Sequence, residues 1–204
     1  LPQEYPEIDF DKMKIHLVDA SPRLLSAMSE GASNDARNTL IKRGIIIHQD
    51  VAVKSYNRPV VELNDGSKLI SRNVFWVAGV RPSALKGLST AAHNNRGRIL
   101  VDSFNRVQGY SDIFAIGDTA MLISDASPKG HPQVAQVALQ MARNLAKNLN
   151  KHDDPKEYAP FVYHDRGSLA TIGRNAAVAD LGKFRFSGRI AWWLWLWVHI
   201  LSII

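Results

Sequence analysis

Cysteine is absent from the 204 residues of this chain. Its absence excludes disulfide bonds, Cys-ligated zinc, cysteine nucleophiles and dithiol redox chemistry within the chain. We expect no metal site. The first six residues also lack the basic segment and apolar run of a signal peptide. Because the chain starts with Leu1 rather than Met, we expect it to belong to a longer protein.

A concentrated basic surface is also missing, although the formal net charge is +6. The basic residues are scattered, apart from a group near the C-terminus formed by Lys183, Arg185 and Arg189. Nucleic-acid binding typically needs a stripe of basic residues interleaved with aromatic ones. We therefore expect no nucleic-acid partner, and anionic cofactors or a membrane surface remain the better explanations of the charge.

Alternating strand and helix patterns are present along the chain. Apolar runs predict strands at 14–19, 44–48, 51–55, 60–63, 73–79, 98–102 and 112–118, with more between 161 and 186. Helical periodicity covers 23–43, ending before Gly44, and 132–150. Asn64-Asp65-Gly66 predicts a hairpin turn. This order of elements favours an α/β fold.

The N-terminal part of a doubly wound unit is missing from this pattern. Such a unit normally opens with a strand and a Gly-rich turn that starts a phosphate-binding helix. Here the first predicted strand arrives at residue 14 without that turn. We therefore expect a partial Rossmann-like fold, with a further boundary in the segment 151–160.

Two positions at strand ends are candidates for nucleotide binding. Asp19 follows a predicted strand, where a carboxylate can accept hydrogen bonds from ribose hydroxyls and would repel a 2′-phosphate. The alternative is an Asp that caps the next helix. Ala78 and Gly79 end another predicted strand, where small residues let a flat ring approach, although a tight turn explains them equally well.

A second group lies between 117 and 140. Gly117-Asp118 ends an apolar strand, so the Gly lets a ligand pass and the carboxylate can accept hydrogen bonds from a polyol. Early in the next helix, Gln136 and Gln140 share one face, while Ala135 and Ala138 keep another face small. Backbone N–H groups at that helix start suit a flavin carbonyl. The alternatives are an Asx turn and two ordinary exposed glutamines.

The C-terminal part holds two more candidates. Arg166-Gly167-Ser168 opens a Gly-punctuated strand that can lie against a planar ring or be a plain β-strand. The last 15 residues hold four of the five tryptophans: Trp192, Trp193, Trp195 and Trp197. This run is shorter than the roughly 20 residues that span a bilayer. Trp next to basic residues favours an interfacial membrane helix, and a buried packing helix or dimer interface is the alternative.

Taken in order, these residues resemble the type II NADH:quinone oxidoreductases, in the flavoprotein superfamily with two dinucleotide-binding domains. The Gly117-Asp118 motif is shared across the superfamily, whereas the Ala135-Gln136 pattern and the Trp-rich end are more specific. The resemblance implies a partial two-domain FAD/NAD(P)-binding fold with a C-terminal membrane-facing domain. It implies the rest of an NADH-binding domain at 1–97, a returning FAD-domain strand and helix at 98–150, and an amphipathic membrane helix within 151–204.

The resemblance also implies a role for each candidate residue. Asp19 would bind NADH, Ala78-Gly79 would lie near the nicotinamide, and Asp118, after Gly117, would hold the FAD ribityl chain. Ala135 would lie by the flavin pyrimidine edge, Arg166-Gly167 near the flavin, and Gln136 and Gln140 as catalytic residues of the quinone site. The four tryptophans would form a monotopic anchor for a peripheral enzyme on the cytoplasmic face of the membrane.

The implied enzyme passes a hydride from NADH to FAD and then electrons to a membrane quinone. Because neither Gly-rich loop is present, we expect this chain alone to lack both cofactors and activity. A homodimer through the C-terminal region is a further expectation. The alternatives are a ferredoxin reductase, a sulfide:quinone oxidoreductase, which the absence of cysteine disfavours, and a non-enzymatic membrane-surface module.

Overall fold

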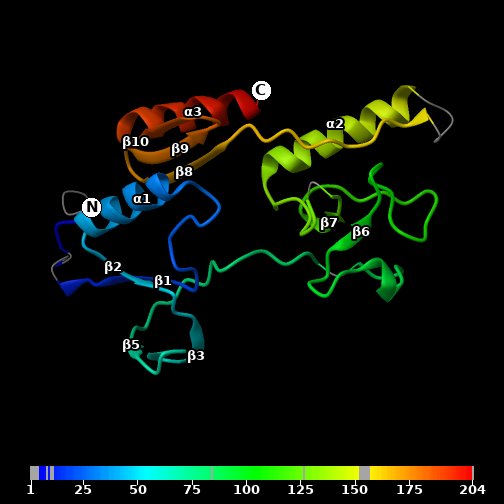
Figure 1. Ribbon diagram of the computed structural model, residues 1–204. Helices are drawn as coiled ribbons and strands as arrows, with labels where there is room; N and C mark the ends of the chain where they lie inside the picture. The colour runs from blue at the N-terminus through cyan, green and yellow to red at the C-terminus, as the bar shows by residue number, and fades with distance from the viewer. Residues whose placement is uncertain are drawn as a thin grey trace. The chain divides into compact units, whose positions relative to one another are not determined.

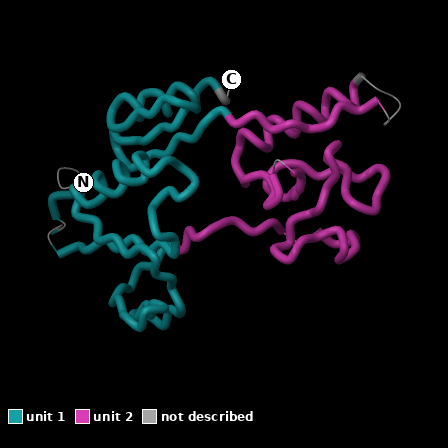
Figure 2. Tube along the Cα trace, viewed as in Figure 1, with its two compact units in different colours: residues 1–75, 166–204 teal, residues 76–165 magenta. Residues whose placement is uncertain are grey.

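The computed structural model describes residues 5–7, 9, 12–83, 85–125, 127–151 and 157–203, with side chains described up to 150 in one helix and 201 in another. It divides into two compact units (Figure 2). Unit 1 holds residues 1–75 and 166–204, and unit 2 holds residues 76–165. The elements alternate between strand and helix over much of the chain, as expected of an α/β fold.

Unit 1 begins with a parallel β-α-β arrangement. Strand β1 (Ile15–Asp19) pairs with β2 (Ile45–Gln49), and helix α1 (Glu30–Lys42) connects them. The helix starts seven residues later than the expected 23, because Leu25 has a left-handed φ of 50° and Ser29 caps the helix. Gly44, with φ of 80°, follows the helix as expected.

An antiparallel meander follows, with β4 (Val60–Leu63) between β3 (Val53–Asn57) and β5 (Lys68–Ile70). The Asn64-Asp65-Gly66 turn joins β4 to β5, so a hairpin at this turn is confirmed. The Asp65 carboxylate accepts hydrogen bonds from the N–H and the hydroxyl of Ser67. These bonds lower the pKa of Asp65.

The prediction of a buried strand at 73–79 is wrong. This stretch has no regular secondary structure, and Phe75 and Val77 are 87% and 86% exposed. No strand among the described residues pairs with it. Side chains that favour strands do not form one without a neighbour to accept and donate the backbone hydrogen bonds.

The C-terminal part of unit 1 is a three-layered structure. The antiparallel sheet runs β10 (Phe184–Ser187), β9 (Ala176–Leu181), β8 (Ser168–Gly173), and α3 (Gly188–Ile203) follows. Helices α1 and α3 both contact β9, and Figure 1 shows them on opposite faces of the sheet. Val178 packs with Met28 and Ala32 toward α1, whereas Ala177 and Ala179 pack with Ala191 toward α3.

Unit 2 contains the short parallel pair β6 (Ile99–Val101) and β7 (Ala120–Leu122) and the helix α2 (Ala135–Lys151), with two 3₁₀ turns, η2 (Thr90–Ala92) and η3 (Gly117–Thr119). The strand expected at 112–118 is wrong. Only an isolated bridge between Arg106 and Phe114 forms there, and the chain enters η3 at Gly117. The core joins both strands to one face of α2 through Val101, Leu122, Val137 and Met141.

Candidate functional site

The Gly117-Asp118 turn lies directly against α2. Gly117 is buried with a φ of 67°, and its N–H faces the Met141 sulfur at 3.4 Å. A Cβ built at this glycine would come within 3.1 Å of the Ala138 Cβ. A larger side chain at either position would therefore push the turn away from the helix. Asp118 is exposed beside this contact.

The start of α2 is held to the same turn. The Gln133 side-chain amide donates a hydrogen bond of 3.1 Å to the Asp118 carbonyl oxygen. Ala135 is the first residue of the helix, and Gln136 follows half-buried. The four residues therefore lie in one region of unit 2, and their shared role in cofactor binding stays a prediction: Gly117, Asp118, Ala135 and Gln136.

Gln140 has a defined structural contact. Its side-chain amide donates to the His164 carbonyl oxygen at 2.9 Å, and its side-chain carbonyl accepts from the His164 N–H at 3.0 Å. This pair of bonds mimics one rung of a β-sheet and ties the segment after residue 157 to α2. Gln140 therefore positions that segment in this structure, and its expected catalytic role stays a prediction.

Arg98 is a buried cation behind the Gly-Asp turn. Its side chain is 8% exposed, and its guanidinium donates to the carbonyl oxygens of His131 (3.2 Å) and Ala120. The Nε atom is buried without a hydrogen-bond partner. Burial lowers the pKa of Arg98, and the nearby Asp118 carboxylate opposes that shift. Buried arginines usually form an ion pair with a carboxylate, whereas the Arg98 guanidinium is hydrogen-bonded to backbone carbonyl oxygens.

His131 lies beside this cation. Its ring packs edge-on against Phe161 and Tyr163, with centroids 5.5 and 5.4 Å away. Burial, and then repulsion by Arg98, lower the pKa of His131. Tyr163 has a raised pKa, because it is partly buried and lies near Asp165.

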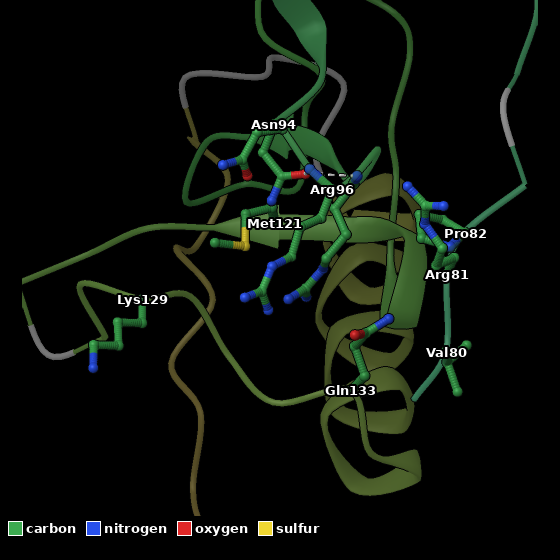
Figure 3. A pocket seen from close by; sticks show the side chains of 10 residues that line it. Val80, Arg81, Pro82, Asn94, Arg96, Met121, Lys129 and Gln133 are labelled. Carbon is green, nitrogen blue, oxygen red and sulfur yellow. Dashed lines mark hydrogen bonds between the residues drawn. The ribbon is translucent and has the colours of Figure 1, made fainter. Parts of the chain in front are cut away.

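A cationic hollow of about 560 Å³ opens in front of Arg98. Arg81, Arg96, Arg98 and Lys129 line it together with Asn94, Asn95 and Gln133, and no Asp or Glu is among the described residues that line it. Figure 3 shows Arg96 and Met121 near its middle, with Arg81 and Pro82 on one side and Lys129 on the other. Gln133 connects this hollow to the Gly-Asp turn through its bond to Asp118.

The other candidates for cofactor binding lie at turns or at the start of a strand. The Asp19 carboxylate accepts a 2.8 Å hydrogen bond from the Ser21 N–H, so it caps a turn rather than helix α1. Ala78 and Gly79 are exposed, and Gly79 has a φ of 110°. A Cβ at Gly167 would lie 2.3 Å from the Asp180 carbonyl oxygen, so this glycine permits close packing of β8 on β9, next to the exposed Arg166.

The four C-terminal tryptophans divide between two faces of α3. Trp192 and Trp195 pack on the sheet beside Ala191, whereas Trp193 and Trp197 are 57% and 59% exposed. The outer face of the helix is also apolar, with Ile190 and Leu201 exposed beside these two tryptophans. Within the part of the chain that the structure describes, no helix is both long and apolar enough to cross a membrane. The same residues contain no group of three side chains that could hold a metal ion.

Comparison with known families decides where this chain belongs. The model of the pyridine nucleotide-disulphide oxidoreductase family matches residues 8–142. This chain belongs to that family. The resemblance to type II NADH:quinone oxidoreductases is confirmed by similarity to the Mycobacterium tuberculosis protein of that name, Ndh, with 33% identity over 98% of this chain and 44% of the relative.

One further relative supports this family, and one solved structure shares the fold. The type II NADH:quinone oxidoreductase of Staphylococcus saprophyticus is 32% identical over 84% of this chain and 43% of its own length. The structure of NDH2 from Plasmodium falciparum in complex with NADH matches the fold with a TM-score of 0.85 and 20% identity, over 100% of this chain and 57% of that one. This chain thus spans less than half the length of these two curated relatives.

Sequence reasoning missed the cationic hollow. No site was predicted at Arg81, Arg96 or Arg98, because the basic residues are scattered along the chain. One signal was present, since Arg98 stands immediately before the apolar strand β6 and was therefore a candidate for a buried charge. The convergence of Arg81 and Lys129 on the same hollow depends on the tertiary fold and has no local pattern.

Proposed function

We propose that this protein passes a hydride from NADH to FAD and then electrons to a membrane quinone. The observation that carries this proposal is the 33% identity to a type II NADH:quinone oxidoreductase across 98% of the chain. The contact of the Gly-Asp turn with α2 supports it, because it joins the residues that the flavin site needs. The whole activity also requires the parts of such an enzyme that this chain does not span.

The residues around Gly117 fit a flavin dinucleotide. Gly117 in a left-handed conformation, with Ala138 close behind it, leaves the turn without bulky side chains. The exposed Asp118 carboxylate can accept hydrogen bonds from ribityl hydroxyls. The first N–H groups of α2, from Ala135 and Gln136, would face the pyrimidine edge of the ring, where the positive end of the helix dipole stabilises negative charge.

Bound FAD would supply the hydride and electron chemistry, and the protein would supply position and electrostatics. Gln136 would contact the quinone beside the ring. Gln140 would act indirectly, because its two bonds to His164 hold the segment next to α2. Arg166 and Gly167 are proposed to lie near the flavin, and Asp19 with Ala78 and Gly79 to bind NADH, in preference to NADPH because a carboxylate repels a 2′-phosphate.

We also propose that the protein is a peripheral membrane protein. Its C-terminal surface would contact the cytoplasmic face of the membrane. Helix α3 and strand β10 expose Phe184, Ile190, Trp193, Trp197 and Leu201. The basic residues Lys183 and Arg189 are close to them in the chain and can bind anionic headgroups, whereas the guanidinium of Arg185 lies against Gly31 of α1. Exposed apolar area of this kind normally marks an interaction surface. The competing proposal is that a second copy of the chain covers the same surface. Flotation with vesicles would indicate membrane binding, and sedimentation at the mass of a dimer would indicate self-association.

The deciding experiment uses the full-length gene product in mild detergent. We expect a yellow protein that oxidises NADH only when a soluble quinone is added. Asp118→Ala should lower flavin occupancy at least about tenfold, since bonds to a charged group contribute about 1.5–3 kcal/mol. Gln136→Ala should raise the KM for quinone while the flavin stays bound.

Two matched variants serve as controls. Asp112→Ala removes an exposed carboxylate from the same segment and should leave flavin content unchanged. Gln108→Ala removes an exposed amide outside α2 and should leave the quinone KM unchanged. A colourless protein without NADH oxidation would contradict the oxidoreductase proposal and leave a membrane-surface module.

A further inference from the structure

The rings of His16 and His48 meet on one face of the β1–β2 pair. In the parallel register His16 lies beside Ile46, and His48 is two residues further along β2. Because alternate side chains of a strand point to the same face, both imidazoles project from the same side of the sheet. The ring planes are 21° apart, and the His16 Nδ1 atom lies 3.0 Å from the His48 Nε2 atom. Two ring nitrogens from distant parts of the chain are thereby brought together.

These two nitrogens can share either a proton or a metal ion. A neutral imidazole has one N–H and one nitrogen with a free lone pair, so one ring donates and the other accepts when they share a proton. With a lone pair on both facing nitrogens, the rings repel one another unless a cation lies between them. Neutral imidazole is the commonest metal ligand in proteins. Burial, and then the charges of His48 and Lys14, lower the pKa of His16, so this ring is neutral at neutral pH.

The separation of the two nitrogens favours one coordination geometry. Imidazole nitrogens bind metal ions at about 2.0–2.1 Å. With the nitrogens 3.0 Å apart, an ion at that distance from both would have an N–metal–N angle of about 91–97°. A regular tetrahedral zinc site would need the nitrogens about 3.3–3.4 Å apart. Neighbouring ligands at right angles are typical of Cu(II) and Ni(II), so the histidine pair suits these ions better than tetrahedral zinc.

The histidine pair is accessible from water and has one charge of each sign near it. His16 is exposed and His48 is half-buried, so water molecules can complete the coordination of an ion. The Asp65 carboxylate interacts electrostatically with His48 and would attract a cation, whereas the Lys14 charge near His16 opposes it. No third His, Cys, Asp or Glu of the described part of the chain completes a group around them. The protein therefore supplies two ligands.

We propose that His16 and His48 form a two-histidine site for a divalent transition-metal ion, with Cu(II) preferred to Ni(II). His16 binds the ion through Nδ1 and His48 through Nε2, and water occupies the other positions. The order of the two ions follows the general rise in affinity from Ni(II) to Cu(II). The sequence indicated no metal site, because 32 positions separate the two ligands. The inference does not rest on the proposed oxidoreductase activity, because it concerns metal binding without NADH, flavin or quinone.

Titration of the full chain with Cu(II) at neutral pH, with free glycine as a weak competing chelator, tests the site. We expect a single ion per chain, with an electron paramagnetic resonance spectrum split by two imidazole nitrogens. Ni(II) and Zn(II) should bind more weakly than Cu(II). His16→Gln should weaken Cu(II) binding at least about tenfold, since even the loss of a group behind a metal ligand costs that much. His164→Gln removes an exposed histidine of unit 2 and should leave the affinity unchanged.

His48→Gln is the second variant and should weaken Cu(II) binding as much as His16→Gln, because either change leaves one ring. Circular dichroism checks that both variants are folded. Cu(II) should also raise the unfolding temperature of the unaltered chain by more than that of either variant, since the site exists only in the folded chain. Unchanged affinity in folded His16→Gln, or a spectrum with a single coupled nitrogen, would overturn the proposal. Equal weakening by His16→Gln and His164→Gln would also overturn it, because Cu(II) would then be bound by separate surface histidines.

Discussion

Strand β9 and the segment 73–79 are both apolar runs, but their environments are opposite. The four residues Ala176–Ala179 are buried, because strands flank β9 on both edges and helices cover both faces. Residues 73–79 have no strand neighbour among the described residues. The side chains of Phe75, Trp76 and Val77 are largely exposed, at 87%, 67% and 86%. The difference teaches that apolar sequence supplies only the tendency to be buried, while neighbouring elements decide whether burial occurs.

The largest expected effect comes from a charge placed at Ala179, which is fully buried against α3. Ala179→Asp should lower the free energy of unfolding of the chain by at least about 3 kcal/mol, because a buried unpaired carboxylate is costly. The measurement is urea denaturation. Val77→Asp is the matched change in the exposed segment and should alter stability by less than about 0.5 kcal/mol. An equal loss at Val77 would show that this segment is covered in solution.

The next effect concerns the close packing of β8 on β9. Gly167→Ala should cost about 2 kcal/mol or more, because φ is +95° and the new Cβ would meet the Asp180 carbonyl oxygen. Gly182→Ala provides the control, since φ is +59° but nothing lies within 4 Å of the Cβ. It should cost only about 1 kcal/mol. Thermal unfolding of the two variants compares them, and equal losses would show that the β8–β9 contact is looser than described.

A smaller effect is expected where α1 meets β9. The Ser29 hydroxyl accepts from the Ala32 N–H and donates to the Asp180 carboxylate at 2.9 Å. Ser29→Ala should therefore cost about 1 kcal/mol through the lost helix cap. Ser26→Ala, an exposed serine just before the helix, should change the urea midpoint little. No difference between the two variants would contradict a role for the cap in docking α1.

The smallest effect concerns the pH dependence of the β1–β2 pair. The His16 and His48 rings stack with a 3.0 Å contact between nitrogens. Burial, then the charges of His48 and Lys14, lower the pKa of His16. The unfolded chain binds a proton near pH 6.5 and the folded chain only at lower pH. Stability from this group is therefore present above about pH 6.5 and lost as pH falls toward the folded pKa.

His16→Gln should reduce this acid sensitivity, measured as the urea midpoint between pH 5 and pH 8. Asn38→Gln, a change of an exposed side chain on α1 that does not titrate, should leave the slope unchanged. Part of the slope should remain in His16→Gln, because the pKa of His131 is also lowered. An unchanged slope in His16→Gln would show that the stacked pair does not affect stability.

Much of the fold was predictable where the signal is local. The strands β1, β2 and β6 and the helix α2 lie close to their expected positions, because each has a short apolar period bounded by turn residues. The start of α1 could not be predicted from the sequence. The left-handed conformation of Leu25 and the cap at Ser29 prevent the helix from including residues 23–29, although these residues have a helical period. The strands expected at 73–79 and 112–118 failed because a strand requires a partner.

The candidate site shows the same limit. The sequence indicated Gly117, Asp118, Ala135 and Gln136, and the structure brings them together through the contact of η3 with α2. It did not indicate the pairing of Gln140 with His164 or the burial of Arg98, whose Nε atom has no hydrogen-bond partner. Both depend on segments that are distant in the chain, so no residue spacing reveals them.

The sequence by itself determined the family, the type of most elements and the apolar, Trp-rich character of α3, because composition and short periods are properties of the chain. Only the tertiary structure decided which apolar runs are buried, which face of α3 stays exposed and which cations share one hollow. The physical reason is that burial, hydrogen-bond pairing and charge repulsion depend on neighbours brought in from far along the chain.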